Sequence, residues 1–260
     1  MAGSPDPAEF LPFAHRLADA AGEIIRRYWR KPIPVEQKAD DSPVTIADRE
    51  VEQTLRDLIR STYPEHGITG EEFGVEGGEA ELVWCLDPID GTKSFITGRP
   101  LFGTLISLVQ DGQPVLGVID QCVLKERWVG VRGQPSLHDG QPIRTRACRS
   151  LDRAVLFATT LQMFATVEDR AAFDRVHDAV RLPMYGGDCY AYGLLAMGFA
   201  DLVVEAGLSD HDFMALVPVV EGAGGLMTDW QGRALGRGSD GRVIAAGDPQ
   251  LHAEAMKLLG

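Results

Sequence analysis

The stretch Leu82–Thr92 constrains the fold more than any other part of this sequence. It begins with the apolar run Leu82-Val83-Trp84-Cys85-Leu86, whose length and composition predict a buried strand. The run leads directly into Asp87-Pro88-Ile89-Asp90-Gly91-Thr92, so Asp87 is expected at the strand end and Pro88 is expected to turn the chain. Asp90-Gly91-Thr92 can then open a helix whose first backbone N–H groups have no partner within it. The stretch therefore predicts carboxylates and free amides together at the edge of a buried sheet.

Two helices are predicted before this stretch. Apolar residues recur at spacings of three and four over residues 10–28, which predicts a helix that ends before Pro32. Thr45-Ile46-Ala47-Asp48 has the pattern of a capping box, and the apolar stripe that follows it continues a second helix to Thr62.

The pattern changes to β-strands after residue 104 and changes again near Cys148. Residues 105–109 and 115–119 flank the turn signal Asp111-Gly112-Gln113-Pro114, which predicts a hairpin, and 127–131 adds a strand. Beyond Cys148 we predict strands at 155–158 and 202–204 alternating with helices at 170–180 and 188–197. Such alternation is typical of a layered α/β structure. We therefore divide the chain into an N-terminal α+β half, residues 1–147, and a C-terminal α/β half, residues 148–260.

Charge and cysteine content exclude several classes of protein. Thirty-eight acidic against twenty-five basic residues give a net charge of −13, which argues against binding to nucleic acid or to an anionic membrane. An anionic substrate can still bind if metal ions reverse the charge locally. The four cysteines contain no Cys-x-x-Cys pair, the N-terminal residues lack the pattern of a secretory signal, and no apolar run approaches the ~20 residues of a membrane helix. We therefore expect a soluble cytoplasmic protein.

Three clusters of acidic residues stand where predicted elements begin or end. They are Gly70-Glu71-Glu72, the Asp87–Thr92 string, and Asp210-His211-Asp212. Any one of these acids is explained by the preference of Asp for helix caps and turns. Together they offer the oxygen ligands that Mg²⁺ prefers, and two such ions could activate a water and stabilise the leaving oxygen of a displacement. The expected ligands from the three segments are Glu71, Asp87, the carbonyl of Ile89, Asp90 and Asp212.

These three motifs, with Gly224-Gly225 after the third, resemble the inositol monophosphatase-like family over almost the whole chain. The resemblance implies a layered αβαβα sugar-phosphatase fold, a homodimer, and a Mg²⁺-dependent, Li⁺-sensitive phosphomonoesterase with two or three ions per site. By the same resemblance, the five groups named above are the metal ligands. Thr92 and Asp48 would help Glu71 polarise the attacking water, and the amides of Gly91 and Thr92 would hold the phosphate.

Two assignments remain open on the residues alone. Asp48 fits a capping box with Thr45 as well as it fits a catalytic role. Lys38 and Asp40-Asp41 lie where the resemblance implies a mobile loop over the metal site, and a solvated run of charges explains them equally.

The substrate is expected to contact Asp188 and Glu205 in the C-terminal half. Two carboxylates there suit a cationic leaving group better than a neutral polyol. An N-cap role for Asp188, and a surface or metal-supporting role for Glu205, are the alternatives. The segments 90–96, 187–193 and 215–225 resemble the histidinol-phosphate phosphatase branch, and the last contains Pro218, a residue that costs ~3 kcal/mol in a helix interior.

We therefore expect hydrolysis of histidinol phosphate to histidinol, a step of histidine biosynthesis. The alternatives are an inositol-1-monophosphatase, a 3′-phosphoadenosine 5′-phosphate phosphatase, and a non-catalytic regulator that binds metal or phosphate. Complete retention of the acidic residues speaks against the regulator.

Overall fold

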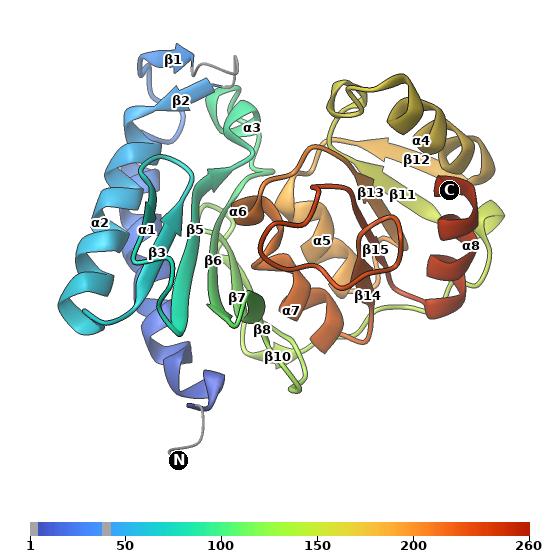
Figure 1. Cartoon of the computed structure of the whole chain (residues 1–260). Coiled ribbons are helices and arrows are strands. Elements are labelled where there is room, and N and C mark those ends of the chain that lie inside the picture. The colour runs from blue at the N-terminus through green and yellow to red at the C-terminus, as the bar shows by residue number, and fades with distance from the viewer. Residues whose placement is uncertain (1–4, 38–42) are drawn as a thin grey trace.

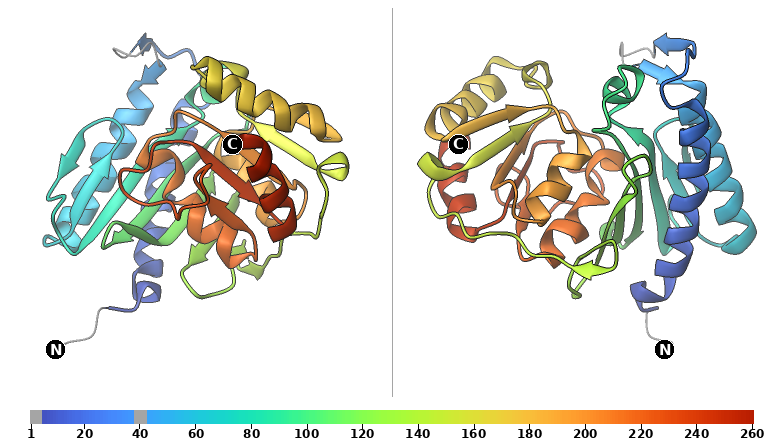
Figure 2. Two further views of the ribbon diagram at one scale, coloured as in Figure 1. Left: turned by 45° about the vertical axis from the view of Figure 1, so that its right-hand side comes forward. Right: turned by 180° about the vertical axis from the view of Figure 1, so that it is seen from behind.

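The computed structural model describes residues 5–37 and 43–260, and its helices and sheets alternate in layers (Figure 1). Helices α1 and α2 cover the outer face of one sheet, α5, α6 and α7 lie between the two sheets, and α4 and α8 cover the outer face of the second (Figure 2). This is the expected layered αβαβα arrangement. The helices are η1 Pro7–Phe10, α1 Leu11–Tyr28, α2 Ile46–Thr62, α3 Thr92–Ile96, η2 Leu151–Arg153, η3 Leu161–Met163, α4 Val167–Ala179, α5 Cys189–Ala196, α6 Asp210–Phe213, α7 Leu216–Gly222 and α8 Pro249–Leu259.

The first sheet has the strand order β10-β9-β8-β7-β6-β5-β3-β4, and only the β3–β5 pair within it is parallel. The predicted hairpin is present: Asp111 and Gly112 join β6 to β7 with φ angles of 50° and 74°, as a two-residue turn requires. The strands are β3 Gly67–Gly70, β4 Gly74–Glu76, β5 Leu82–Asp90, β6 Gly103–Gln110, β7 Gln113–Gln121, β8 Glu126–Val131, β9 Leu137–His138 and β10 Gln141–Pro142. A separate pair, β1 Val35–Gln37 and β2 Pro43–Thr45, lies beside α2.

Strand β5 differs from the expectation that Pro88 would turn the chain. The strand continues to Asp90, and its pairing with β6 shifts register between Asp87 and Asp90. Proline has no N–H to donate and is tolerated in a sheet at such an irregularity. The carbonyl of Pro88 accepts a hydrogen bond from Thr104 Oγ1 at 2.9 Å, so the bulge is held in place and both carboxylates remain on one strand.

The second sheet has the order β12-β11-β13-β15-β14, with β11, β12 and β13 parallel. Its strands are β11 Val155–Ala158, β12 Leu182–Tyr185, β13 Leu202–Glu205, β14 Leu226–Thr228 and β15 Val243–Ala246. The carboxyl ends of the parallel strands lie along one edge, and they lead into Thr159, into the Gly186–Asp188 segment, and to Glu205 itself. Open α/β sheets bind their ligands just beyond the carboxyl ends of the parallel strands.

Helix α7 packs closely on the first sheet because two strands present glycine to it. A Cβ atom on Gly117 would overlap the carbonyl of Ala215, and one on Gly130 would overlap Pro218. Pro218 itself is the third residue of α7, because the chain leaves α6 at Phe213 and starts a new helix at Leu216. Our expectation of a proline within a helix interior was therefore wrong, since a first-turn N–H has no helical partner to lose.

Within the two described ranges, no helix is long and apolar enough to cross a bilayer.

Candidate metal centre

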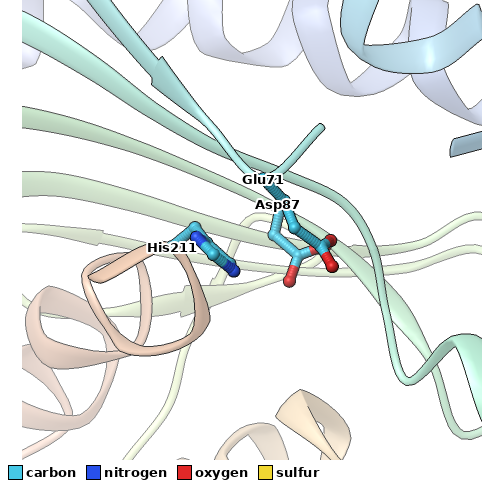
Figure 3. Close-up of side chains that lie close together, drawn as sticks. All are labelled: Glu71, Asp87 and His211. Carbon is cyan, nitrogen blue, oxygen red and sulfur yellow. The ribbon is translucent and has the colours of Figure 1, made fainter. Parts of the chain in front are cut away.

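Four carboxylates from three elements meet at the junction of β3, β5 and α6. The parallel pairing of Gly70 with Leu86 places the next residues of the two strands, Glu71 and Asp87, side by side. Oxygen atoms of Asp87, Asp90 and Asp212 lie within 4.8 Å of one another, and so do ligand atoms of Glu71, Asp87 and His211. Figure 3 shows the carboxylates of Glu71 and Asp87 together, with the His211 ring reaching toward them from α6.

Burial and mutual repulsion perturb this group strongly. Burial raises the pKa of Asp87 well above its usual range, and the charges of Glu71, Asp90 and Asp212 raise it further. Burial also raises the pKa of Asp90, and Asp188 and Asp212 add to the effect. Asp87 Oδ1 is buried and accepts no hydrogen bond from any described residue. Such a cluster is costly unless a cation is bound, so these residues fit a divalent metal ion.

The segment after β5 supplies the remaining predicted groups. Thr92 Oγ1 donates to the carbonyl of Ile89 at 3.1 Å, which places that carbonyl and hydroxyl together beside the acids. Gly91 is the N-cap of α3 with φ 84°, and a Cβ there would lie 3.0 Å from Asp188 Oδ2, so only glycine fits. Asp90 does not cap α3. Its Oδ2 instead accepts a 2.6 Å hydrogen bond from the amide of Cys189 at the start of α5.

Asp48 forms a capping box with Thr45, as one of the two interpretations of this residue predicted. Its Oδ2 accepts hydrogen bonds from Thr45 N at 2.8 Å and from Thr45 Oγ1 at 2.6 Å. Burial raises the pKa of Asp48, and the charge of Glu71 contributes to the rise. The catalytic role of Asp48 stays a prediction.

Glu52 was missed by the sequence reasoning although it positions the first acidic motif. Its carboxylate is fully buried and accepts hydrogen bonds from Glu72 N at 2.7 Å and Phe73 N at 3.1 Å, directly after Glu71. It also pairs with the buried Arg56 at 2.8 Å. A Cβ on Gly70 would overlap this carboxylate, which explains the glycine before Glu71. The only signal in the sequence was an acid on the apolar face of the second helix.

His211 joins the cluster, although no role was predicted for it from the sequence. Its ring Nε2 lies 3.6 Å from Asp212 Oδ1, and its side chain is mostly buried. Its position beside Asp212 was the only hint in the sequence: His211 is the second residue of α6, and α6 packs on β5. The predicted loop residues Lys38, Asp40 and Asp41 lie outside the described residues.

Asp188 and Glu205 lie at the carboxyl edge of the second sheet. Asp188 is not the capping side chain of α5: its Oδ2 accepts from Ser94 Oγ at 3.0 Å, and its backbone adopts φ 46°, which is rare for a non-glycine residue. The oxygens of Glu205 accept from Thr159 N at 2.9 Å and from Tyr192 Oη at 2.8 Å. Burial raises the pKa of Glu205 to about 7. A substrate-binding role for these two residues stays a prediction.

The comparison with family models decides to which family this fold and site belong. A model of the inositol monophosphatase family matches residues 6–260. The chain belongs to that family. It is 50% identical to the bifunctional phosphatase IMPL2 of Arabidopsis thaliana over 96% of this chain and 75% of that protein. It is 35% identical to a histidinol-phosphatase of Chlorobaculum parvum over 90% of this chain and 91% of the relative.

A solved structure of an inositol monophosphatase from Zymomonas mobilis is also similar. It matches with a TM-score of 0.89 and 50% identity, covering 97% of this chain and 98% of that one. The fold and the phosphatase family are thus shown, and the acidic cluster could hold the metal of such an enzyme.

Proposed function

We propose that this inositol monophosphatase family member is a Mg²⁺-dependent phosphatase that hydrolyses histidinol phosphate to histidinol, a step of histidine biosynthesis. The observation that carries the proposal is that Asp188, a mostly buried carboxylate, lies against the metal centre. Its charge contributes to the raised pKa of Asp90, and a Cβ atom on Gly91 would touch its side chain. A carboxylate beside the phosphate site suits an alcohol that carries a positive charge. The 35% identity to a protein named histidinol-phosphatase adds support.

The residues of the centre have distinct parts in this proposal. The groups that would hold two or three Mg²⁺ ions are Glu71, Asp87, Asp90, Asp212 and the carbonyl of Ile89. Bound ions would supply a lowered pKa of a water and neutralise charge on the phosphate.

Glu71, Thr92 and Asp48 orient the attacking water. The amides of Gly91 and Thr92 stand at the start of α3, where they would bind the phosphate.

Hydrolysis of inositol monophosphate is the second candidate. It is favoured by the similarity to the Zymomonas mobilis inositol monophosphatase, and the name of the Arabidopsis relative states two activities without saying which. A neutral polyol would gain little from the charge of Asp188, so relative rates on esters of cationic and of uncharged alcohols separate the two candidates.

Phosphate release from a substrate panel tests the proposal. The panel contains histidinol phosphate, inositol 1-phosphate, glycerol phosphate and 3′-phosphoadenosine 5′-phosphate, each with Mg²⁺ and with EDTA. We expect kcat/KM for histidinol phosphate to exceed that for every other ester. Preference for inositol 1-phosphate or for 3′-phosphoadenosine 5′-phosphate would show that the proposed substrate is wrong. No phosphate release from any ester would favour a regulator that binds without catalysis.

We also propose a homodimer in the cytoplasm that needs no nucleic acid or membrane. Strand β12 is an edge strand that exposes Leu182, Met184 and Tyr185, and an apolar sheet edge favours pairing with a second copy. Light scattering on the purified chain tests the dimer.

A further inference from the structure

A cavity lined by several arginines lies in the C-terminal half, apart from the metal centre. It has a volume of about 490 Å³, within the size range of small-molecule sites. The residues that line it include Arg146, Cys148, Arg149, Arg153, Arg181 and Asp201.

The fold places this cavity at the opposite edge of the second sheet from Asp188 and Glu205. Arg181 directly precedes β12, Asp201 directly precedes β13, and Arg153 stands two residues before β11. The three strands are parallel, so the cavity lies at their amino ends while the candidate catalytic groups lie at their carboxyl ends. Each strand has four residues, which separates the two edges by about 13 Å. The cavity is therefore not part of the metal centre.

Arg146 is the lining arginine with an acidic partner, whereas Arg149, Arg153 and Arg181 have none among the described residues. Asp201 is the acid in the lining, and Arg146 binds both of its oxygens at 2.6 Å while Val155 N donates to one of them. Within residues 5–37 and 43–260, no acid forms an ion pair with Arg149, Arg153 or Arg181.

The neighbouring acids do not change this balance. Asp152 is exposed outside the lining, and Glu254 accepts a hydrogen bond from the amide of Leu151. Three exposed arginines without an acidic partner thus line one cavity in a chain whose net charge is −13.

We propose that this arginine cavity binds a small soluble phosphate anion of the size and charge of a diphosphate or larger. Guanidinium groups recognise phosphate through paired, charge-assisted hydrogen bonds, and several arginines around one concave site are suited to an anion with several charges. The bidentate pair of Arg146 with Asp201 fixes one wall, so the cavity is partly organised before an anion binds. The site is independent of the substrate proposed above.

Binding of inorganic pyrophosphate to the full chain in EDTA tests the proposal. Without metal ions, the acidic centre repels anions, and Asp90→Asn provides a second check because it alters the centre and leaves the cavity intact. The variant of the arginine cavity, called the pocket variant below, is Arg149→Ser/Arg181→Ser. Its matched control is Arg16→Ser/Lys31→Ser, which removes the same charge from exposed positions on or just after α1.

Cys148 supplies a local reporter. It lines the cavity and is half-buried, whereas the other three cysteines are buried. Pyrophosphate bound in the cavity should slow alkylation of Cys148 by iodoacetamide, and binding elsewhere should not.

We expect the parent, the control and Asp90→Asn to bind one pyrophosphate per chain with Cys148 protected, and the pocket variant to bind at least about tenfold more weakly. Equal affinity of the pocket variant and the parent would overturn the proposal. So would undiminished alkylation of Cys148 at saturating pyrophosphate, or the absence of binding at millimolar concentration.

Discussion

The carboxylate of Asp90 joins the two halves of the chain, because its Oδ2 accepts a 2.6 Å hydrogen bond from the backbone amide of Cys189. Asp90 is the last residue of β5, and Cys189 is the first residue of α5. A first-turn amide has no partner within its own helix, so Asp90 satisfies it from the other half of the chain. The same carboxylate lies within 4.8 Å of Asp87 and Asp212 ligand atoms. Asp90 thus links the metal centre to the segment that carries Asp188.

Asp90→Asn should therefore separate catalysis from folding. Asparagine keeps an oxygen that can accept from Cys189 N but loses the charge that holds a metal, so we expect activity to fall by at least about 100-fold. In EDTA the variant should melt no lower than the parent, since one member of a repelling cluster is removed. Asp111→Asn is the matched control: the residue lies in the β6–β7 turn with φ 50°, which asparagine tolerates. Parental activity in Asp90→Asn would eliminate the metal role.

Metal removal should abolish activity, and Mg²⁺ should restore it. Li⁺ at millimolar concentration should inhibit, because it is similar in size to Mg²⁺ and carries half the charge. Burial raises the pKa values of Asp87 and Asp90, so these ligands ionise at higher pH than ordinary carboxylates and the Mg²⁺ requirement should rise as pH falls. Melting curves with and without Mg²⁺ should show stabilisation of the parent, and full activity in EDTA would sink the metal mechanism.

Glu52 is a positioning residue whose loss should weaken metal binding without touching the substrate. Glu52→Gln breaks a buried ion pair with Arg56 and weakens the hydrogen bonds from Glu72 N and Phe73 N. We therefore expect the free energy of unfolding to fall by about 3–5 kcal/mol. The Mg²⁺ concentration for half-maximal activity should rise about tenfold, while KM for the phosphate ester at saturating Mg²⁺ stays near the parental value. Glu50→Gln on the same helix removes a half-exposed pair with Arg27 and should cost less than about 1 kcal/mol. An unchanged Mg²⁺ requirement would make Glu52 purely structural.

The sequence predicted most elements because local patterns determine them. The Asp111-Gly112 turn, the Thr45 capping box and the apolar run of β5 each need only neighbouring residues. The partners of Asp90 and Asp188 could not be predicted this way. Cys189 is 99 positions from Asp90, and Ser94 is 94 positions from Asp188, so these hydrogen bonds depend on how the two halves pack. The capping preference of Asp pointed to nearby helices, and tertiary contacts decided otherwise.

Glu205 should make stability depend on pH. Its pKa is raised to about 7 in the folded chain by burial, against a usual value of 4.5, so the folded state binds more protons than the unfolded state between these values. The free energy of unfolding should therefore fall as pH rises from about 4.5 through about 7, by roughly 3 kcal/mol. Glu205→Gln resembles the protonated form and should lack this dependence. Urea unfolding of the parent and of Glu205→Gln in EDTA, from pH 4.5 to about 7, measures this dependence. A difference in the free energy of unfolding that stays constant over this pH range would mean that Glu205 is ionised throughout.

Asp188→Asn should change substrate selectivity and leave the metal centre intact. If Asp188 contacts a positively charged alcohol, kcat/KM for histidinol phosphate should fall about tenfold or more, as expected for the loss of a charge-assisted contact. Asparagine retains an oxygen for the hydrogen bond from Ser94 Oγ, so the scaffold around Gly91 should persist. Turnover of glycerol phosphate, whose alcohol part is uncharged, serves as the internal control and should change little. Equal losses on both esters would assign Asp188 to the scaffold, because a residue that only shapes the phosphate site acts on every phosphomonoester alike.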